Sequence, residues 1–286
     1  MLRLSRDHAE LLIAPEIGGG IAALRFGGIE ALRPASARAL REGDALGLGE
    51  FPMAPFVNRV AGNGFTWQGQ RITLAPAKAG AGEALHGIAW QQPWQVIETQ
   101  PDTALLGVEI LPTQAWPFAC RLTRRFTLSP RALRMDMMLT AGPDQPMPAA
   151  LGFHPYFPAA DAIIQAETGA AWAADAQGIP ASHEKIAACA ALRAGTKASD
   201  LPLDHCFTGW DGCARLYWPR HELTLRAWPN PGFLQIYTPK GADYFCMEPQ
   251  TAMPDAFNRP FSISGARSLA QSERQELGFE IAFAAR

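Results

Sequence analysis

Apolar residues alternate with polar ones in many short runs along the chain. In the run ELGFEIAFA at 276–284, every second side chain from Leu277 to Phe283 is apolar. Alternation with a period of two is typical of a strand that buries one face. Comparable runs predict further strands at 2–6, 9–15, 94–100, 104–111, 119–128, 131–140, 221–228 and 232–238.

The connections between these runs are short. Only Ser129–Pro130 separates two of the strands, which is too little chain for the helical crossover that parallel strands need. Gln68–Gly69 divides FTWQGQRITL into two strand-like halves and predicts a hairpin. Helical patterns are few, with a short helix predicted at Ala187–Leu192 and one helical turn in the loop between Arg33 and Gly49. We therefore expect an all-β fold, a large and mostly antiparallel β-sandwich with few short helices.

The composition is that of an ordinary globular protein. Of the 286 residues, 48% are hydrophobic and 18% charged, which is enough apolar material for a sizeable core. Neither a linker nor a change in composition divides the chain, so we expect a single domain over residues 1–286. The net charge of -2 gives no reason to expect nucleic acid as a partner, because phosphate backbones are bound by clustered Lys and Arg.

Three features predict the cellular setting. The N-terminal stretch MLRLSRDHAELLIAP has charged residues where a secretory signal would be apolar. No run approaches the ~18 apolar residues that a membrane-spanning helix needs. The five cysteines are odd in number and contain no CxxC pair, which suits reduced thiols. The expectation is a cytoplasmic protein with no membrane partner.

His154 is the first candidate for chemistry. It lies in LGFHPYFP at 151–158, where Pro155 and Pro158 restrict the backbone and favour extended geometry before each ring. We therefore expect His154 in a rigid and partly desolvated segment. Histidine titrates near neutral pH, which suits a general acid or base, although a single buried histidine is more often only structural.

Glu248 is the second candidate. It follows the apolar run YFCM and precedes a proline, a setting that predicts a raised pKa in the working range of a base. The alternative is a carboxylate exposed in a loop. Other polar groups occur in similar surroundings, namely Asn58, Arg59, His86 and Asp204. Together these groups suit proton transfer on a polyhydroxylated substrate.

The aromatic residues and the spacing of metal-ligating residues contribute less to the prediction of function. Aromatic side chains that are candidates for the apolar face of a sugar ring, or else for the core, are Phe56, Trp90, Tyr156 and Tyr237. The sequence has no HxH or HExxH spacing, so no metal is predicted.

Six stretches, in this order, carry a family resemblance: NRVAGNGFTWQGQRITL, LHG, LGFHPYF, LDHCF, LQIYT and MEPQT. With them the chain resembles the aldose 1-epimerases, also called galactose mutarotases, from about residue 15 to the C-terminal strand. The resemblance implies a β-sandwich with an active site in an open cleft on one sheet. It also implies an isomerase that needs no cofactor and acts on a small sugar in carbohydrate metabolism, as a monomer or homodimer.

The resemblance further implies roles for individual residues. His154 would be the acid that protonates the ring oxygen, and Glu248 the base that takes the proton of the anomeric hydroxyl. The sugar ring would open, rotate about its C1–C2 bond and close on the other face, with a bell-shaped dependence of rate on pH. The residues expected to bind the sugar are Asn58, Arg59, His86, Tyr156, Asp204 and Gln235.

Other functions remain open at this stage. A hexose-6-phosphate 1-epimerase would need additional cations for the phosphate, and candidates are Arg25, Arg71 and Lys78. A glycoside hydrolase would use a pair of carboxylates, for which Glu248 and Asp204 are available. A non-catalytic sugar-binding protein would need no acid and base at all.

Overall fold

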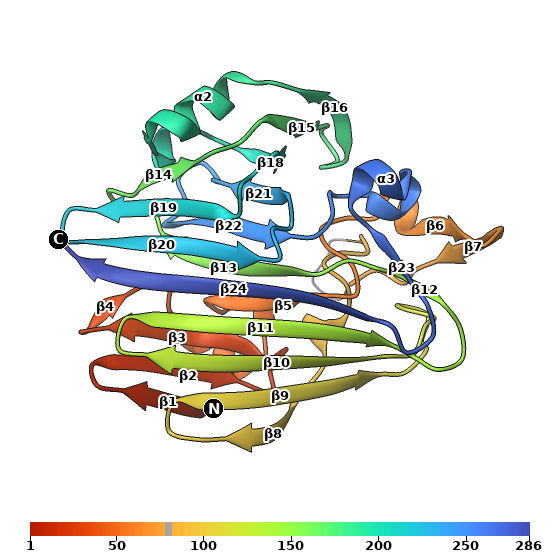
Figure 1. Cartoon of the computed structure of the whole chain (residues 1–286), viewed down its shortest axis with the longest axis horizontal. Coiled ribbons are helices and arrows are strands. Elements are labelled where there is room, and N and C mark those ends of the chain that lie inside the picture. Colours follow the sequence, from red (N-terminus) through yellow and green to blue (C-terminus); the bar gives the residue numbers. More distant parts are fainter. Residues whose placement is uncertain (78–81) are drawn as a thin grey trace.

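Two large antiparallel sheets lie face to face, with one hydrophobic core between them (Figure 1). The structure is a computed structural model that describes residues 1–77 and 82–286. The predicted β-sandwich is therefore confirmed. Lys78, a candidate phosphate ligand, lies outside the described residues.

The first sheet contains, in spatial order, β1 (Leu2–Arg6), β2 (Ala9–Ala14), β3 (Gly20–Phe26), β5 (Glu50–Met53), β13 (Gly152–Pro158), β22 (Tyr244–Gln250), β21 (Phe233–Tyr237), β18 (Asp204–Thr208), β15 (Ala170–Ala174) and β16 (Pro180–Glu184), with β4 (Ile29–Glu30) beside β3. The second contains β17 (Thr196–Lys197), β14 (Ile163–Ala166), β19 (Cys213–Trp218), β20 (His221–Trp228), β24 (Arg274–Ala285), β11 (Ala132–Ala141), β10 (Cys120–Ser129), β9 (Thr103–Ile110) and β8 (Gln95–Thr99).

The remaining elements are short. Two small sheets pair β6 (Gly64–Trp67) with β7 (Gln70–Thr73) and β12 (Met147–Ala149) with β23 (Arg267–Leu269). The helices of the described residues are α1 (Ala37–Glu42), α2 (Ala187–Ala194) and α3 (Phe261–Ser264). None of them is long and apolar enough to cross a membrane.

The strands predicted from alternating apolar residues are present. β10 and β11 pair antiparallel through a tight turn at Pro130–Arg131, one residue later than expected, and β6 and β7 form the predicted hairpin. On β24, Leu277, Phe279 and Ile281 are fully buried, as the alternation predicted. The helix predicted at Ala187–Leu192 and the helical turn expected before Gly49 are also found, as α2 and α1.

The central strands of the first sheet have no alternating pattern. β5, β13 and β22 are buried along almost their whole length, because one face packs on the second sheet and the other is covered by loops. Strands covered on both faces lack the alternation that identifies a half-buried strand. For this reason the sequence predicted an extended segment around His154 but not its place in a sheet.

A buried ion pair joins the two sheets. Arg124 on β10 places Nη2 2.8 Å from both carboxylate oxygens of Glu50 on β5, and its Nη1 donates to the Gly19 carbonyl at 2.7 Å. Both charged side chains are 0% exposed. The pair lies on the core side of β5, and the neighbouring Phe51 points to the opposite face.

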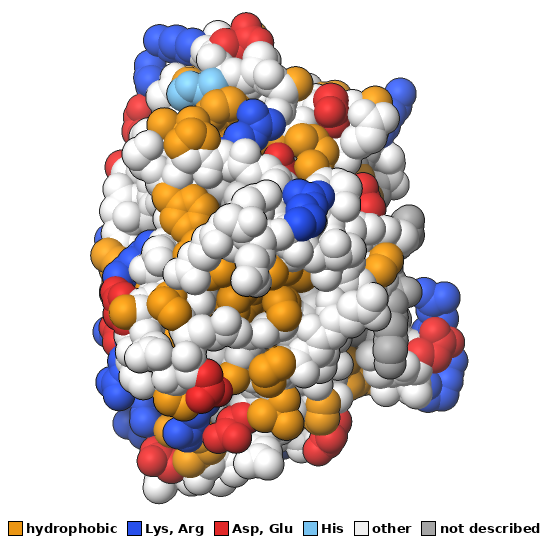
Figure 2. All heavy atoms as spheres, turned by 90° about the vertical axis from the view of Figure 1, so that its right-hand side faces the viewer, with side chains coloured by type: hydrophobic (Ala, Val, Ile, Leu, Met, Phe, Trp, Pro, Cys, Tyr) orange, Lys and Arg blue, Asp and Glu red, His pale blue; other side chains and the backbone are white. Residues whose placement is uncertain are grey.

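The end of the molecule that carries α3 and the β6–β7 hairpin has a mixed surface. Figure 2 shows positive and negative side chains spread over this face, with small groups of hydrophobic side chains between them. Among the described residues, the cations on this face form no continuous stripe of the kind that binds a phosphate backbone.

Candidate active site

Two rows of side chains cross the first sheet on the face turned away from the core. Residues that pair between neighbouring strands point to the same face, so each row can be followed from strand to strand. The first row contains His154 on β13, Glu248 on β22 and Gln235 on β21. The adjacent row contains Tyr156, Cys246, Tyr237 and Asp204. Three antiparallel pairings thus bring together residues that are far apart in the sequence.

The rows form the floor of a cleft of about 250 Å³. Its lining consists of Leu46, Asn58, Arg59, Leu85, His86, His154, Tyr156, Asp204, Gln235, Tyr237 and Glu248. All eight residues predicted to act on or bind the sugar are in this set. Their convergence is therefore a feature of the fold, whereas their roles stay predictions.

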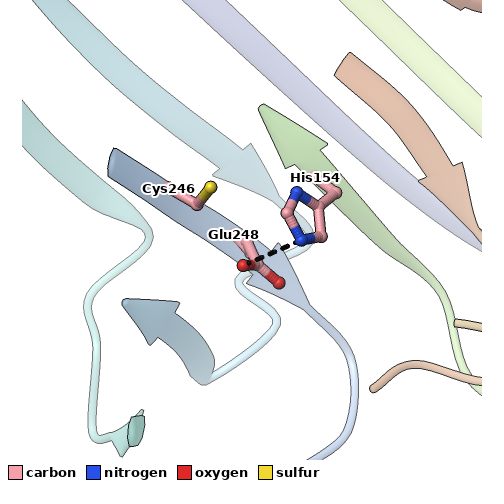
Figure 3. A group of neighbouring side chains, drawn as sticks. All are labelled: His154, Cys246 and Glu248. Carbon is pink, nitrogen blue, oxygen red and sulfur yellow. Dashed lines mark ion pairs between the residues drawn. The ribbon is translucent and has the colours of Figure 1, made fainter. Parts of the chain in front are cut away.

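His154 and Glu248 face each other directly across β13 and β22. Nε2 of His154 lies 3.3 Å from Oε1 of Glu248, and both side chains are buried (Figure 3). The imidazole stacks on Phe51 with ring centroids 4.5 Å apart and meets the His86 ring edge-on at 5.0 Å. These contacts hold the imidazole in one orientation, as a proton-transfer group requires.

Burial changes the pKa values of both members of this pair. It raises the pKa of Glu248 well above its ordinary value, an effect that the nearby Asp204 carboxylate increases. It lowers the pKa of His154 to about 3. Both changes favour the uncharged form, because each group loses the water that would stabilise its charge.

His86 is fixed by a reciprocal contact with Asn58. The Asn58 backbone N–H donates to Nδ1 of His86 at 3.2 Å, and the His86 backbone N–H donates to the Asn58 carbonyl at 2.8 Å. Burial holds the pKa of His86 well below its usual range, so the ring is neutral. Because Nδ1 accepts a hydrogen bond, the ring proton is on Nε2, and His86 is a donor there.

The conformation of the LHG stretch depends on Gly87. Its φ is +71°, and a Cβ at this position would lie 1.9 Å from the Ala54 carbonyl oxygen. Only glycine permits so close an approach of the two backbones. An isolated parallel bridge between Ala54 and Gly87 joins this loop to the end of β5 and so fixes His86 at the cleft.

Hydrogen bonds also orient the polar groups at the rim. Nε of Arg59 donates to Glu83 at 2.8 Å, and the Asn58 side-chain oxygen accepts from the Arg59 backbone N–H at 2.9 Å. Nε2 of Gln235 donates to Asp204 at 2.7 Å. The rim therefore presents a guanidinium and a carboxylate, a polar arrangement suited to hydroxyl groups.

Some residues of the site were missed or wrongly considered. Phe56 and Trp90, two of the aromatic candidates, are buried in the core and do not line the cleft. Leu46 and Leu85 line it without any sequence signal that distinguishes them from core leucines. Arg33 does not line the cleft but packs on one of its walls, with its guanidinium carbon 4.0 Å from the centroid of the Tyr156 ring, and this contact was not predicted.

A set of metal-ligating atoms is also present at the floor of the cleft. One ligand atom from each of His154, Cys246 and Glu248 lies within 4.8 Å of the other two (Figure 3). This group was not predicted from the sequence, because its ligands come from two strands that only the folded sheet brings together. No cofactor was predicted, and the proton transfers described below use only side chains of the protein.

Comparison with known proteins gives relatives of one kind. An uncharacterized Escherichia coli K12 protein, YphB, is 29% identical over 226 residues, which cover 73% of this chain and 75% of YphB. The crystal structure of an Escherichia coli K12 protein provisionally described as an aldose 1-epimerase has a TM-score of 0.90 and 26% identity, covering 99% of this chain and 98% of the other.

More distant structures share the fold. Galactose 1-epimerase from Lactobacillus acidophilus has a TM-score of 0.82 at 17% identity, with 99% of this chain and 93% of the other covered. A galactose mutarotase-like protein from Clostridium acetobutylicum has a TM-score of 0.89 at 16% identity, covering 99% and 95%. The family model for aldose 1-epimerase matches residues 1–277. The chain is therefore a member of the aldose 1-epimerase family.

Proposed function

We propose that this protein interconverts the α and β anomers of a free aldose by opening and closing the sugar ring. The observation that carries the proposal is the contact of 3.3 Å between His154 Nε2 and Glu248 Oε1 on the floor of the cleft. The ring oxygen and the anomeric hydroxyl are both bonded to C1 of the sugar. One acid and one base side by side can therefore reach the two oxygens of the same carbon.

The reaction needs two proton transfers in each direction. Glu248 takes the proton of the anomeric hydroxyl, and His154 gives a proton to the ring oxygen as the C1–O bond breaks. The open aldehyde then turns about C1–C2. Ring closure on the other face returns the proton from Glu248 to the new anomeric oxygen and restores the proton of His154.

The pair needs a single proton for this cycle. With the carboxyl protonated and the imidazole neutral, it has the form that burial favours. Transfer of that proton to the imidazole gives the ionised carboxylate and the charged imidazolium with no change in total charge. The reactive form thus differs from the resting form only by a transfer across a contact of 3.3 Å.

Neighbouring groups would bind the sugar. His86 can donate from Nε2 to an oxygen on which charge develops, and such fixed donors stabilise a transition state in a site that excludes water. Asp204 and Gln235 form a hydrogen-bonded acceptor and donor for ring hydroxyls. Tyr156 and Tyr237 add aromatic walls.

A sugar phosphate fits this cleft less well than a neutral sugar. Among the described residues that line it, the one cation is Arg59, which already pairs with Glu83. Neither of the two described candidate phosphate ligands, Arg25 and Arg71, lines the cleft, and Arg25 already pairs with Glu10 and Glu30. We therefore propose a neutral aldose as the substrate.

Polarimetry tests the proposal. Fresh α-D-glucose and α-D-galactose should reach the same final rotation faster with the protein than without it. His154→Asn and Glu248→Gln should each lower kcat by roughly 10²–10⁴-fold, because each removes a proton-transfer group. Calorimetric sugar affinity should change only a few-fold, since both variants keep the size and hydrogen-bonding capacity of the side chain.

Matched controls separate this result from loss of fold. His8→Asn and Glu276→Gln replace an exposed histidine and an exposed glutamate outside the cleft, and both should leave the rate unchanged. Near-full activity in His154→Asn or Glu248→Gln would refute the assigned role. Sugar binding by the wild-type protein without any acceleration, with glucose 6-phosphate as a third substrate, would instead support a non-catalytic sugar-binding protein.

A further inference from the structure

Three side chains with different metal-ligating atoms converge beneath the cleft. Figure 3 shows Cys246 and Glu248 projecting from the same face of β22 toward the His154 ring on β13. A nitrogen, a sulfur and a carboxylate oxygen from these residues all lie within 4.8 Å of one another. Imidazole, thiolate and carboxylate together form a ligand set typical of zinc.

Two of these side chains have unsatisfied polar atoms. Nδ1 of His154 and Oε2 of Glu248 are buried and have no hydrogen-bond partner. Buried polar groups are normally paired, so orphaned atoms in a native structure indicate either a strained site or a place for a ligand. Other buried polar atoms in the described residues also lack a partner, but these two belong to one group of metal-ligating side chains.

The geometry requires only a small adjustment. Zinc takes nitrogen and oxygen ligands at about 2.0–2.2 Å and sulfur at about 2.3 Å, so tetrahedral ligand atoms lie roughly 3.5 Å apart. The separations here, up to 4.8 Å, exceed this by roughly 1.3 Å, so the three side chains must move closer together when the ion binds. His154 and Glu248 also line the cleft, which provides the entry path and an open fourth position for water.

We propose that a thiophilic divalent cation, with Zn²⁺ as the probe, binds to His154, Cys246 and Glu248 and excludes the sugar. The thiol proton leaves to solvent as the sulfur–metal bond forms. The ion is an inhibitor and not a cofactor, because it binds through the imidazole and carboxylate needed for proton transfer. Binding of the ion does not depend on the proposed reaction, whereas the inhibition rests on it.

Cobalt substitution tests the binding directly. The fully reduced protein titrated with Co²⁺ should develop a thiolate-to-cobalt charge-transfer band, and excess Zn²⁺ should abolish it. Calorimetry with Zn²⁺ should give one site per chain. Cys246→Ser should remove the band and weaken Zn²⁺ binding by about tenfold or more, since even indirect support of a metal ligand is worth 10–100-fold.

A second thiol gives the matched control. Cys213 on β19 of the other sheet is half-buried and lies outside the ligand group, so Cys213→Ser should keep the band and the affinity. Cys246→Ala repeats the test if the serine variant does not fold. A band that persists without Cys246, or no band in the wild-type protein at saturating Co²⁺, overturns the proposal.

Competition separates this inference from the proposed function. A sugar bound in the cleft should raise the Zn²⁺ concentration needed for half-saturation, and Zn²⁺ should inhibit mutarotation competitively with the sugar. Zn²⁺ binding in a protein that does not accelerate mutarotation would uphold the metal site and refute the reaction. Mutarotation that is indifferent to Zn²⁺, with no cobalt band, would refute the metal site alone.

Discussion

The His154–Glu248 pair titrates as a unit. The two groups are in contact, so the proton lost at each step belongs to the pair and not to one residue. Burial lowers the pKa of His154 to about 3 and raises that of Glu248 well above its usual range. Between these two values the pair keeps one proton, which is the number that the proposed reaction needs.

The pH dependence of kcat/KM should follow from this order. Below a pH of about 3 the imidazole is protonated as well as the carboxyl group. The pair then holds two protons, and Glu248 can no longer act as a base. Above the raised pKa of Glu248 the pair loses its last proton, and the acid is lost. We therefore expect nearly full kcat/KM at pH 5 and a decline on the alkaline side, measured by polarimetry in weakly catalytic buffers.

The opposite profile would contradict this assignment. Activity that is absent at pH 5 and rises through the ordinary pKa of histidine, ~6.5, would mean that His154 must lose a proton before the enzyme works. Stability should be followed in the same buffers, so that acid unfolding is not taken for loss of a catalytic proton.

Residue types in their local settings already predicted part of this chemistry. The apolar neighbours of Glu248 predicted a raised pKa, and the prolines around His154 predicted a rigid and desolvated ring. The contact between the two residues was not predictable locally, because it depends on the pairing of β13 with β22. Nothing in the sequence around Cys246 suggests a metal ligand, because Cys246 comes close to His154 only through the pairing of the two strands.

At the level of elements, the conformation of the loop that carries His86 depends on one glycine, Gly87. The Gly87 Cβ position lies 1.9 Å from the Ala54 carbonyl oxygen and 2.2 Å from the carbonyl carbon. These are backbone atoms at the end of β5, so they cannot turn aside as a flexible side chain would. Any side chain at this position must therefore push the loop away from the strand.

Gly87→Ala should thus lower both stability and activity. We expect a loss of at least about 2 kcal/mol in the free energy of unfolding, from the contact and from the positive φ together. The displaced His86 should raise KM as well as lower kcat. Urea unfolding and steady-state polarimetry measure the two effects.

Gly232→Ala is the matched control. Gly232 has a similar φ, +75°, but a Cβ there meets nothing within 4 Å. It should show only the conformational penalty, ~1 kcal/mol. Equal losses in the two variants would mean that the contact with Ala54 contributes nothing to the fold.

The elements themselves divide into predictable and unpredictable ones. Strands of the second sheet such as β10, β11 and β24 alternate and were predicted close to their observed bounds. Of the strands of the site, β21 was predicted, whereas β13 and β22 do not alternate and contain prolines, which are unusual in a central strand. The order of the strands in the sheet could not be predicted from local sequence patterns. β5 and β13, for example, are neighbours in the sheet but about a hundred residues apart in the chain.

At the scale of the whole molecule, Arg124 and Glu50 connect the two sheets through the core. Burial raises the pKa of Glu50 even with Arg124 beside it. Arg124→Met would leave the carboxylate without its partner, and breaking a buried pair in this way typically destabilises by about 3–5 kcal/mol. We expect a loss of this size in urea unfolding at neutral pH.

The loss should grow with pH. Without Arg124 the folded state keeps a proton on Glu50 that the unfolded chain releases near pH 4.3, so stability falls as pH rises above that value. Replacing both residues with methionine should restore most of the stability, because an apolar pair has no charge to desolvate. Arg193→Met, which breaks the exposed pair with Glu167, should change stability by less than about 1 kcal/mol.

The same connection supports the prediction that the chain is a single domain. Two sheets that share one core and a buried ion pair should unfold together. Calorimetry should show one transition whose calorimetric and van't Hoff enthalpies agree. Two resolved transitions, with activity lost in the first, would show that the sheets are separate units.

Because His154 and Glu248 face each other across β13 and β22, activity depends on the register of these two strands and can be used to test for correct refolding. A slip of β22 by one residue would turn Met247 and Pro249 to the cleft in place of Glu248, because neighbouring residues on a strand alternate between faces. Such a molecule would keep its strand content, and far-ultraviolet circular dichroism would not distinguish it from the native form. Turnover divided by the far-ultraviolet circular dichroism signal therefore measures the fraction of refolded molecules in which β13 and β22 pair in the native register.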